Sequence, residues 1–477
     1  MKSTIGILMG TLFLLVACSQ EFEELNTNPN APTQVQPALL LRQVIYSYAD
    51  GMSYEGFTGG ANLGQYFSAE PGFNAFDRGD LLAPQFGGNP WPLLYQNLRD
   101  IEIVLELARE STVNAVYEGP ALVMKSIIAG TLTDLFGDIP YTEAAMGRSG
   151  LVTPRYDEQA AIYLGEGGLL DNLSTAVELM DTYAGVEPLE GDVLYNGDLE
   201  AWVRFANSLR LKYATRALDA DQSKATAEVL EVQRDGRLIL TNDQNAVFRF
   251  GSAPNDFRFA RARLGDFTNY LMAETIDSVL DAYNDPREQL WFRESNAGGY
   301  NGVPNGLPDA SLLDGGAVSL PGTIWREDAG QLQFPFMTAW ETSFLLAELG
   351  ARPIIFDNPA VRYDSGIELA FAYWGVALPG DYLSRPEIAY ENGRALEQIA
   401  AQRWLASIGN GYEGWIEWRR TGYPAFMQPL SSLNAGLIPI RFPYPADEQA
   451  LNSEAYGRAL EALGGENSPN VAVWWDR

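Results

Sequence analysis

Histidine is absent from all 477 residues of this chain, and cysteine occurs once, at Cys18. Without histidine, the chain lacks the most common general acid/base, the most common metal ligand and the usual pH switch. A Ser-His-Asp triad and a paired-histidine metal site are therefore excluded. A single cysteine allows neither an internal disulfide nor a thiolate cluster for zinc. The function classes that remain are binding, carboxylate-only catalysis and oxygen-ligated cation sites.

Positive charge is also scarce. The chain has 62 acidic residues against 32 basic ones, of which only four are lysine (Lys2, Lys125, Lys212 and Lys224), and its formal net charge is -30. Such a surface repels nucleic acid and anionic lipid, so we expect no nucleic-acid partner and membrane contact through an anchor only. Acidic, lysine-poor chains are typical of saline habitats, although a G+C-rich genome also favours arginine. Both explanations stay open.

The first residues have the pattern of a secretory signal. Lys2 precedes an apolar run from Ile5 to Ala17, which is shorter than the roughly 20 apolar residues of a membrane span. The sequence LVAC at residues 15–18 resembles a bacterial lipobox, in which the cysteine is lipidated and becomes the mature N-terminus. We predict a lipoprotein signal peptide over residues 1–17 and lipidation of Cys18. An ordinary signal peptide or an uncleaved anchor is the alternative.

The rest of the chain divides into a tether and one domain. Residues 18–36 are acidic and then rich in asparagine and proline, as in a solvated tether. Residues 37–477 contain no further apolar run of membrane length and are long enough for a large core, so we predict a single α-rich domain.

Helical periodicity marks two blocks, about 90–235 and 335–410. In the first, for example, Leu94, Leu98, Ile101 and Leu105 fall on one helix face. Short glycine and proline breaks separate successive helices, which favours tetratricopeptide-like helix pairs. The strict 34-residue consensus is absent, so periodicity alone predicts a mainly α chain of paired helices.

Two segments, about 60–90 and 240–330, are instead irregular and rich in glycine, proline, asparagine and aromatic residues. Long irregular segments in a compact protein often carry its function. Sugar rings stack on aromatic side chains, while their hydroxyls need polar groups at the edge. The predicted ligand-binding set is Tyr66, Phe73, Asn74, Phe76, Arg78, Trp291, Tyr300 and Trp325. Any one of these aromatics is more often core than contact, so the prediction concerns the set.

Ordered motifs across the chain resemble those of the SusD/RagB-like nutrient-binding outer-membrane lipoproteins. The most specific is LTDLFGDIPY at Leu132–Tyr141. The others are Leu25–Asn30, Trp202–Tyr213, Asn284–Arg287, Phe344–Glu348, Trp415–Pro424 and Arg441–Pro445.

This resemblance implies a superhelical scaffold of tetratricopeptide-like helix pairs that supports a large irregular ligand-binding region. It also implies a binding protein without enzymatic activity or cofactor, anchored in the outer membrane and exposed on the cell surface. Such a protein captures oligosaccharides, or in some cases peptides, and delivers them to a TonB-dependent transporter, a SusC-like barrel.

Most motif residues also have a structural explanation. Gly137, Asp138 and Pro140 suit a helix end, and Asp285-Pro286-Arg287 suits a turn or helix start. The Asp134/Asp138 pair lacks the dense oxygen pattern of a calcium loop, so we expect no metal there. Two alternatives to nutrient capture remain: an α-rich glycoside hydrolase with carboxylates about 5–10 Å apart, and a helical-repeat scaffold that binds only protein.

The saline-habitat hypothesis predicts that the melting temperature rises with ionic strength, because salt screens repulsion among the excess carboxylates. Thermal unfolding of the soluble form from low to multimolar KCl measures this. A melting temperature that does not change over that range would contradict the hypothesis.

Overall fold

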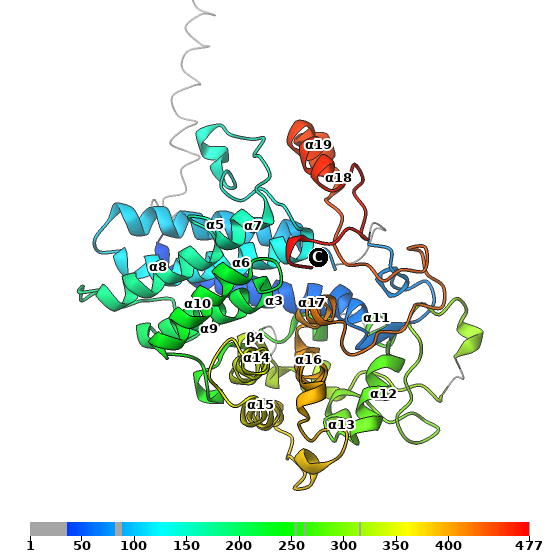
Figure 1. Ribbon diagram of the computed structural model, residues 1–477. Coiled ribbons are helices and arrows are strands. Elements are labelled where there is room, and N and C mark those ends of the chain that lie inside the picture. The colour runs from blue at the N-terminus through cyan, green and yellow to red at the C-terminus, as the bar shows by residue number, and fades with distance from the viewer. Residues whose placement is uncertain (1–35, 82–87, 253–254, 262–263, 314–315, 477) are drawn as a thin grey trace, which may run out of the picture.

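The computed structural model describes residues 36–81, 88–252, 255–261, 264–313 and 316–476 (Figure 1). The predicted signal peptide, the predicted lipidation site Cys18 and the tether up to residue 35 lie outside the described residues.

The first block consists of long helices that pack in sequence order, each against the next, with the short α7 (Gln159–Leu164) beside α6 and α8. The long helices are α3 (Pro37–Glu55), α5 (Trp91–Glu110), α6 (Glu118–Phe136), α8 (Leu169–Thr182), α9 (Leu199–Ala217) and α10 (Gln222–Asp235). The predicted stripe from Leu94 to Leu105 is the buried face of α5. Helix α6 is buried on nearly every side and ends at Gly137, whose φ is 82°, as the motif predicted.

The second block contains α14 (Ala339–Ala351), α15 (Pro359–Tyr373), α16 (Ala395–Ala406) and α17 (Gly411–Thr421). Helix α14 packs against both α15 and α16, and α16 packs against α17. Contacts between α9 and α14 join the two blocks, which lie one above the other in Figure 1. The predicted mainly α architecture of consecutive helix pairs is confirmed.

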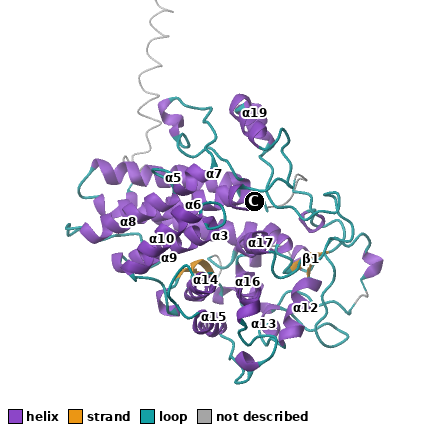
Figure 2. Cartoon of the chain, in the orientation of Figure 1, coloured by secondary structure: helices purple, strands orange, loops and turns teal. Residues whose placement is uncertain are grey.

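Loops dominate the third part of the molecule, on the right in Figure 2. One small antiparallel pair, β1 (Phe67–Ala69) with β3 (Tyr270–Met272), lies in this part, and a second, β2 (Ala246–Arg249) with β4 (Gln333–Met337), packs against α3 and α9 of the first helix block. The β1–β3 pair brings the two predicted irregular segments together. The short helices of this loop-rich part are α4 (Ala61–Leu63), α11 (Leu264–Phe267), α12 (Glu274–Tyr283) and α13 (Glu288–Trp291). Helix α12 was not predicted, although Ile276, Leu280 and Tyr283 recur at helical spacing, because it lies inside the segment 240–330 that we interpreted as irregular.

The C-terminal helices α18 (Ala446–Leu451) and α19 (Ser453–Ala462) project beyond the blocks, at the upper right in Figure 1. Two hydrogen bonds fasten their start to the loop before α7. The Tyr156 hydroxyl donates to the Glu448 carboxylate at 2.7 Å, and Asn452 Nδ2 donates to the Pro154 carbonyl at 2.8 Å.

A network of buried charges joins the two helix blocks. Arg216 of α9 pairs with Asp134 of α6 and with Glu413 of α17. Lys212, one turn earlier, lies 3.1 Å from Glu413 Oε2 and 3.0 Å from Oε1 of Glu341 in α14. Since a buried ion costs several kcal/mol unless it is paired, each of these charges holds its partner helix in register.

The network continues through the second block. Arg403 of α16 lies 3.0 Å from Glu341 Oε1, 3.2 Å from Glu413 Oε1 and 2.8 Å from Glu417 Oε2. Arg420 grips Glu348 of α14 with two bonds of 2.6 Å and reaches Glu417 Oε1 at 2.9 Å. Five helices therefore contribute to one connected set of buried ion pairs.

Replacing Glu413 with glutamine should destabilise the fold, because Lys212, Arg216 and Arg403 would lose a shared buried counter-charge. We expect a loss of about 3–5 kcal/mol in the free energy of unfolding, measured by urea titration. The control is E454Q, which removes an ion pair with Arg458 on the exposed surface of α19 and should cost under about 0.5 kcal/mol.

The same variant has a defined pH dependence. Burial alone would raise the pKa of Glu413, but Arg216, Lys212 and Arg403 overcome it and hold that pKa well below its ordinary 4.5. The carboxylate therefore stabilises the folded state above about pH 4.5 and loses this contribution as the pH falls below that value. The stability gap between wild type and E413Q should shrink on acidification, and a gap that stays constant down to acid unfolding would contradict the assignment.

Candidate ligand-binding surface

The irregular part is organised around the buried carboxylate of Asp77. It accepts hydrogen bonds from Asn305 Nδ2 at 2.6 Å and from the Gly306 N–H at 2.7 Å. The Ser68 hydroxyl lies 3.5 Å away. Burial raises the pKa of Asp77 to about 7, even though these donors oppose the shift. One side chain thus ties β1 to the segment that follows α13.

Gln65 draws a third segment, residues 423–437, into the same region. Its Nε2 donates to the Met427 carbonyl at 2.6 Å, and its Oε1 accepts from the Met427 N–H at 3.0 Å and from the Thr275 hydroxyl. Arg78 adds two bonds of 2.9 Å to the carbonyl and hydroxyl of Ser431. Sequence reasoning missed this segment, because its contacts are with residues distant in the chain, such as Gln65, which is 362 positions from Met427.

Two hollows open on either side of α12, and Ser278 lines both. The larger, which we call the groove, has a volume of about 570 Å³; its walls come from α12, residues 386–397 and residues 424–427. The smaller, which we call the acidic hollow, has a volume of about 420 Å³. It is lined by Asp277, Ser278, Asp281, Glu288 and Tyr300.

The acidic hollow combines one aromatic ring with several hydrogen-bonding groups. Asp277 is oriented by the Gly302 N–H, which donates to Oδ2 at 2.8 Å. Burial raises the pKa of Glu288 to about 7, and the charges of Asp277, Asp281 and Asp285 add to the shift. Near neutral pH, Glu288 can therefore either donate or accept a hydrogen bond. A ring face beside such groups matches what a sugar needs.

Of the predicted ligand-binding residues, Phe73, Arg78 and Tyr300 are half-buried and still present part of their side chains to solvent. They face different neighbours. Phe73 packs edge-on against Tyr270 with ring centroids 5.3 Å apart, Arg78 holds Ser431, and Tyr300 lines the acidic hollow. A role in ligand binding stays a prediction for these three, and Tyr300 lies at the acidic hollow.

The other five are buried, with their partners inside the fold. Tyr66 stacks on Trp404 at 4.7 Å, Trp325 Nε1 donates to the Trp291 carbonyl at 2.9 Å, and Phe76 meets Phe442 at 5.9 Å. Asn74 Nδ2 donates to the Thr58 carbonyl at 2.6 Å. In this conformation Tyr66, Asn74, Phe76, Trp291 and Trp325 support the loops and have at most 7% of their surface exposed for a ligand.

The sequence prediction also left out the carboxylates of α12. Asp277 and Asp281 are four residues apart, which places them on one face of a helix. That spacing would have identified the acidic face if α12 itself had been predicted.

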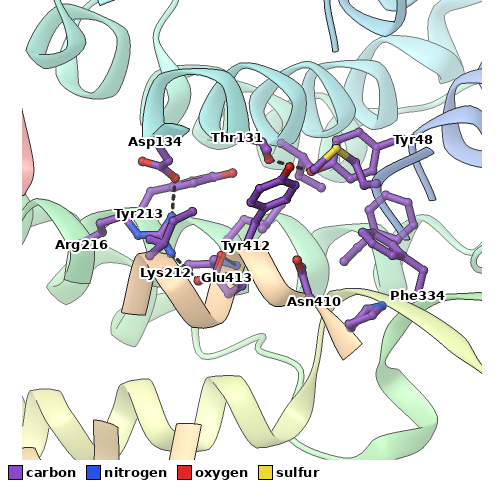
Figure 3. Close-up of a pocket in the computed structure, with 16 residues that line it drawn as sticks. Tyr48, Thr131, Asp134, Lys212, Tyr213, Arg216, Phe334, Asn410, Tyr412 and Glu413 are labelled. Atoms are coloured by element: carbon purple, nitrogen blue, oxygen red, sulfur yellow. Dashed lines mark hydrogen bonds and ion pairs between the residues drawn. The ribbon is translucent and has the colours of Figure 1, made fainter. Parts of the chain in front are cut away.

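A small enclosed cavity inside the charge network resembles a catalytic centre at first sight (Figure 3). Tyr48, Lys212, Glu413 and Asp134 converge on it from α3, α9, α17 and α6. Its volume of about 30 Å³ suits one or two water molecules and no sugar ring. Its charged groups are also held in ion pairs, so it offers no free carboxylate pair for glycoside hydrolysis.

The described part of the chain shows no group of three or more acidic or cysteine side chains placed to hold a metal ion. Nor does any helix in the described ranges have the length and apolarity that a membrane span requires.

A scaffold of helix pairs that carries an irregular, hydrogen-bonded region with open hollows defines a binding protein of the helical-repeat class. The chain belongs to the SusD-like family: the family model described as "Starch-binding associating with outer membrane" matches residues 29–445. Family membership confirms the resemblance seen in the sequence motifs, and it makes the chain a binding protein rather than an enzyme.

Solved structures confirm the fold. A chitin-binding SusD homologue from Flavobacterium johnsoniae is 24% identical, with a TM-score of 0.79 over 93% of this chain and 99% of that one. A SusD homologue from Bacteroides fragilis is also 24% identical, with a TM-score of 0.80 over 93% and 100%. A SusD-like protein from Bacteroides thetaiotaomicron is 22% identical, with a TM-score of 0.78 over 92% and 98%. No curated protein matches the chain in sequence.

The raised pKa of Glu288 gives a testable pH dependence. Because the folded-state pKa of about 7 exceeds the ordinary 4.5, wild type loses stability as the pH rises between these values. The variant E288Q carries no such charge, so its melting temperature should exceed that of wild type at about pH 8 and match it at about pH 4. The exposed Glu294 supplies the control E294Q, which should follow wild type throughout. Equal melting temperatures for E288Q and wild type at pH 8 would contradict the assignment.

Proposed function

We propose that this protein is a lipid-anchored receptor on the outer-membrane surface that captures oligosaccharides and delivers them to a TonB-dependent transporter. The observation that carries the proposal is the acidic hollow, where the Tyr300 ring lies among hydrogen-bonding groups from α12 and α13. The family description as starch-binding, and the likeness in fold to a chitin-binding homologue, support a glycan as the cargo.

The chemistry of the hollow limits which glycans it takes. Three acidic side chains, Asp277, Asp281 and Glu288, line one space and make its potential negative whenever they are ionised. Uronic acids and sulfated sugars are therefore repelled, whereas neutral and amino sugars are accepted. The volume of about 420 Å³ lies within the range of roughly 300–1,000 Å³ that is usual for small-molecule sites.

The anchor accounts for the membrane association in this proposal. A chain with net charge -30 is repelled by anionic lipid, so its own surface supplies no attraction to the membrane. Lipidation of Cys18 would supply it, and the predicted tether up to residue 36 would let the folded domain reach both a polysaccharide and a transporter. Mass spectrometry of the N-terminus of protein from isolated outer membranes tests this step, since an unmodified N-terminus would contradict it.

Ligand binding is tested with the soluble form that lacks residues 1–18. Isothermal titration with chitin, starch and polyuronate oligosaccharides should show binding of a neutral or amino-sugar chain and none of the polyuronate. The variant Y300A should weaken that binding about tenfold, which corresponds to about 1.4 kcal/mol, because the stacking face is lost.

Tyr183 provides the matched control. It is a half-buried tyrosine at the end of α8, in the helical block, whose hydroxyl donates to the Glu187 carbonyl at 3.1 Å. Y183A should bind like wild type. If Y300A also bound every glycan like wild type, the acidic hollow would not be the site; if a peptide array bound and no glycan did, the cargo would be peptide.

A further inference from the structure

The segment that Gln65 and Arg78 hold in place has an unusual composition. Residues 421–440 contain no charged side chain, although 20% of the chain is charged and about four charges would be expected in that length. Since the chain as a whole has a net charge of -30, this uncharged stretch differs in charge from the rest of the protein.

The same segment exposes apolar side chains. Of the fifteen large apolar residues that are exposed among the described residues, five lie within positions 423–437. Their exposed fractions are 39% for Tyr423, 37% for Met427, 58% for Leu430, 50% for Leu433 and 50% for Leu437. Single exposed apolar residues are common, but a concentration of them marks an interaction site. We call residues 423–437 the apolar loop.

Backbone hydrogen bonds hold the apolar loop against the irregular region. The N–H groups of Leu430 and Ser431 donate to the carbonyls of Asn305 and Gly306 at 3.0 and 2.9 Å, and the Leu433 N–H donates to the Arg78 carbonyl at 2.7 Å. Phe426 turns inward and stacks on Trp418 with parallel rings 4.5 Å apart. The exposed leucines are therefore presented on a fixed backbone, as the orange segment after α17 in Figure 1.

The charge pattern decides what covers this loop. Anionic lipid is disfavoured, because the loop has no lysine or arginine and the chain is strongly acidic. A second copy is disfavoured too, because two chains of charge -30 repel each other. An apolar, uncharged surface on another protein fits. The description of the family as associating with the outer membrane supports a partner protein that is itself embedded in that membrane.

We propose that the apolar loop is the surface by which this chain docks onto an integral outer-membrane protein. The inference rests on the proposed function and identifies where the transporter touches this chain. The apolar loop lies next to the candidate ligand-binding surface. Pro424, Ala425 and Met427 form one wall of the groove, and the loop is hydrogen-bonded to Asn305 and Gly306, a few residues after Tyr300.

The test compares full-length, affinity-tagged chains purified from detergent-solubilised outer membranes of the native host. Wild type should bring down a TonB-dependent barrel, identified by mass spectrometry. The double variant L430E/L433E should recover at least tenfold less barrel per chain, because two carboxylates would be buried in the interface. Both side chains are half exposed or more, so the melting temperature of the variant should match that of wild type.

Val186, which is 91% exposed in the loop after α8, supplies the control V186E, and it should recover the barrel like wild type. Soluble L430E/L433E should keep wild-type affinity for the glycan identified above. Barrel recovery that stays high in L430E/L433E, or that falls equally in V186E, would overturn the docking surface and leave the proposed function standing. A wild-type chain that binds glycan but recovers no barrel would overturn delivery itself. Recovery of a dimer of this chain would show that the apolar loop contacts a second copy, and binding of the soluble form to vesicles of outer-membrane lipid would show that it contacts lipid. Either result would overturn the proposed partner.

Discussion

The buried ion pairs between α6, α9, α14, α16 and α17 are the interaction on which the rest of the structure depends. Lys212 and Arg216 extend from the first helix block into carboxylates of the second, and Glu413 receives three cations at once. Apolar contacts tolerate small shifts between helices, but a buried charge that loses its partner costs several kcal/mol. The network therefore fixes how the two blocks meet, and with them the position of α17, from which the apolar loop departs.

A rigid scaffold leaves the irregular part free to carry the function. Its loops are held by a few polar residues with distant partners: Asp77 holds residues 305–306, Gln65 holds Met427, and Arg78 holds Ser431. These side chains find their hydrogen-bond partners inside the fold. The residues on the outer surface are therefore available for binding a ligand or a partner. An acidic face with one half-buried tyrosine lies on one side of α12, and an uncharged apolar loop lies beyond the other. Capture and docking are thereby assigned to neighbouring but separate surfaces.

Periodicity predicted the helices that bury a continuous stripe. Helices α5, α8 and α15 were found in this way, because each packs one face against a neighbour over several turns. The short α12 was missed because its ten residues stand within a segment rich in glycine, proline and asparagine, although their apolar spacing is helical. The aromatic residues of the irregular segments were the harder case. Trp291 and Trp325 were predicted as contacts, but an irregular segment must also build its own core, and these indoles are fully buried in it.

The sequence by itself determined what chemistry this protein lacks and which family it belongs to. The absence of histidine and the single cysteine need no structure to exclude a catalytic triad or a zinc site, and motifs such as Leu132–Tyr141 are local in the chain. Only the tertiary structure decided which aromatic residues face solvent and which carboxylates share a hollow. The physical reason is that exposure is set by contacts distant in sequence. Gln65 and Met427, 362 residues apart, bond to each other, and no local pattern encodes that meeting.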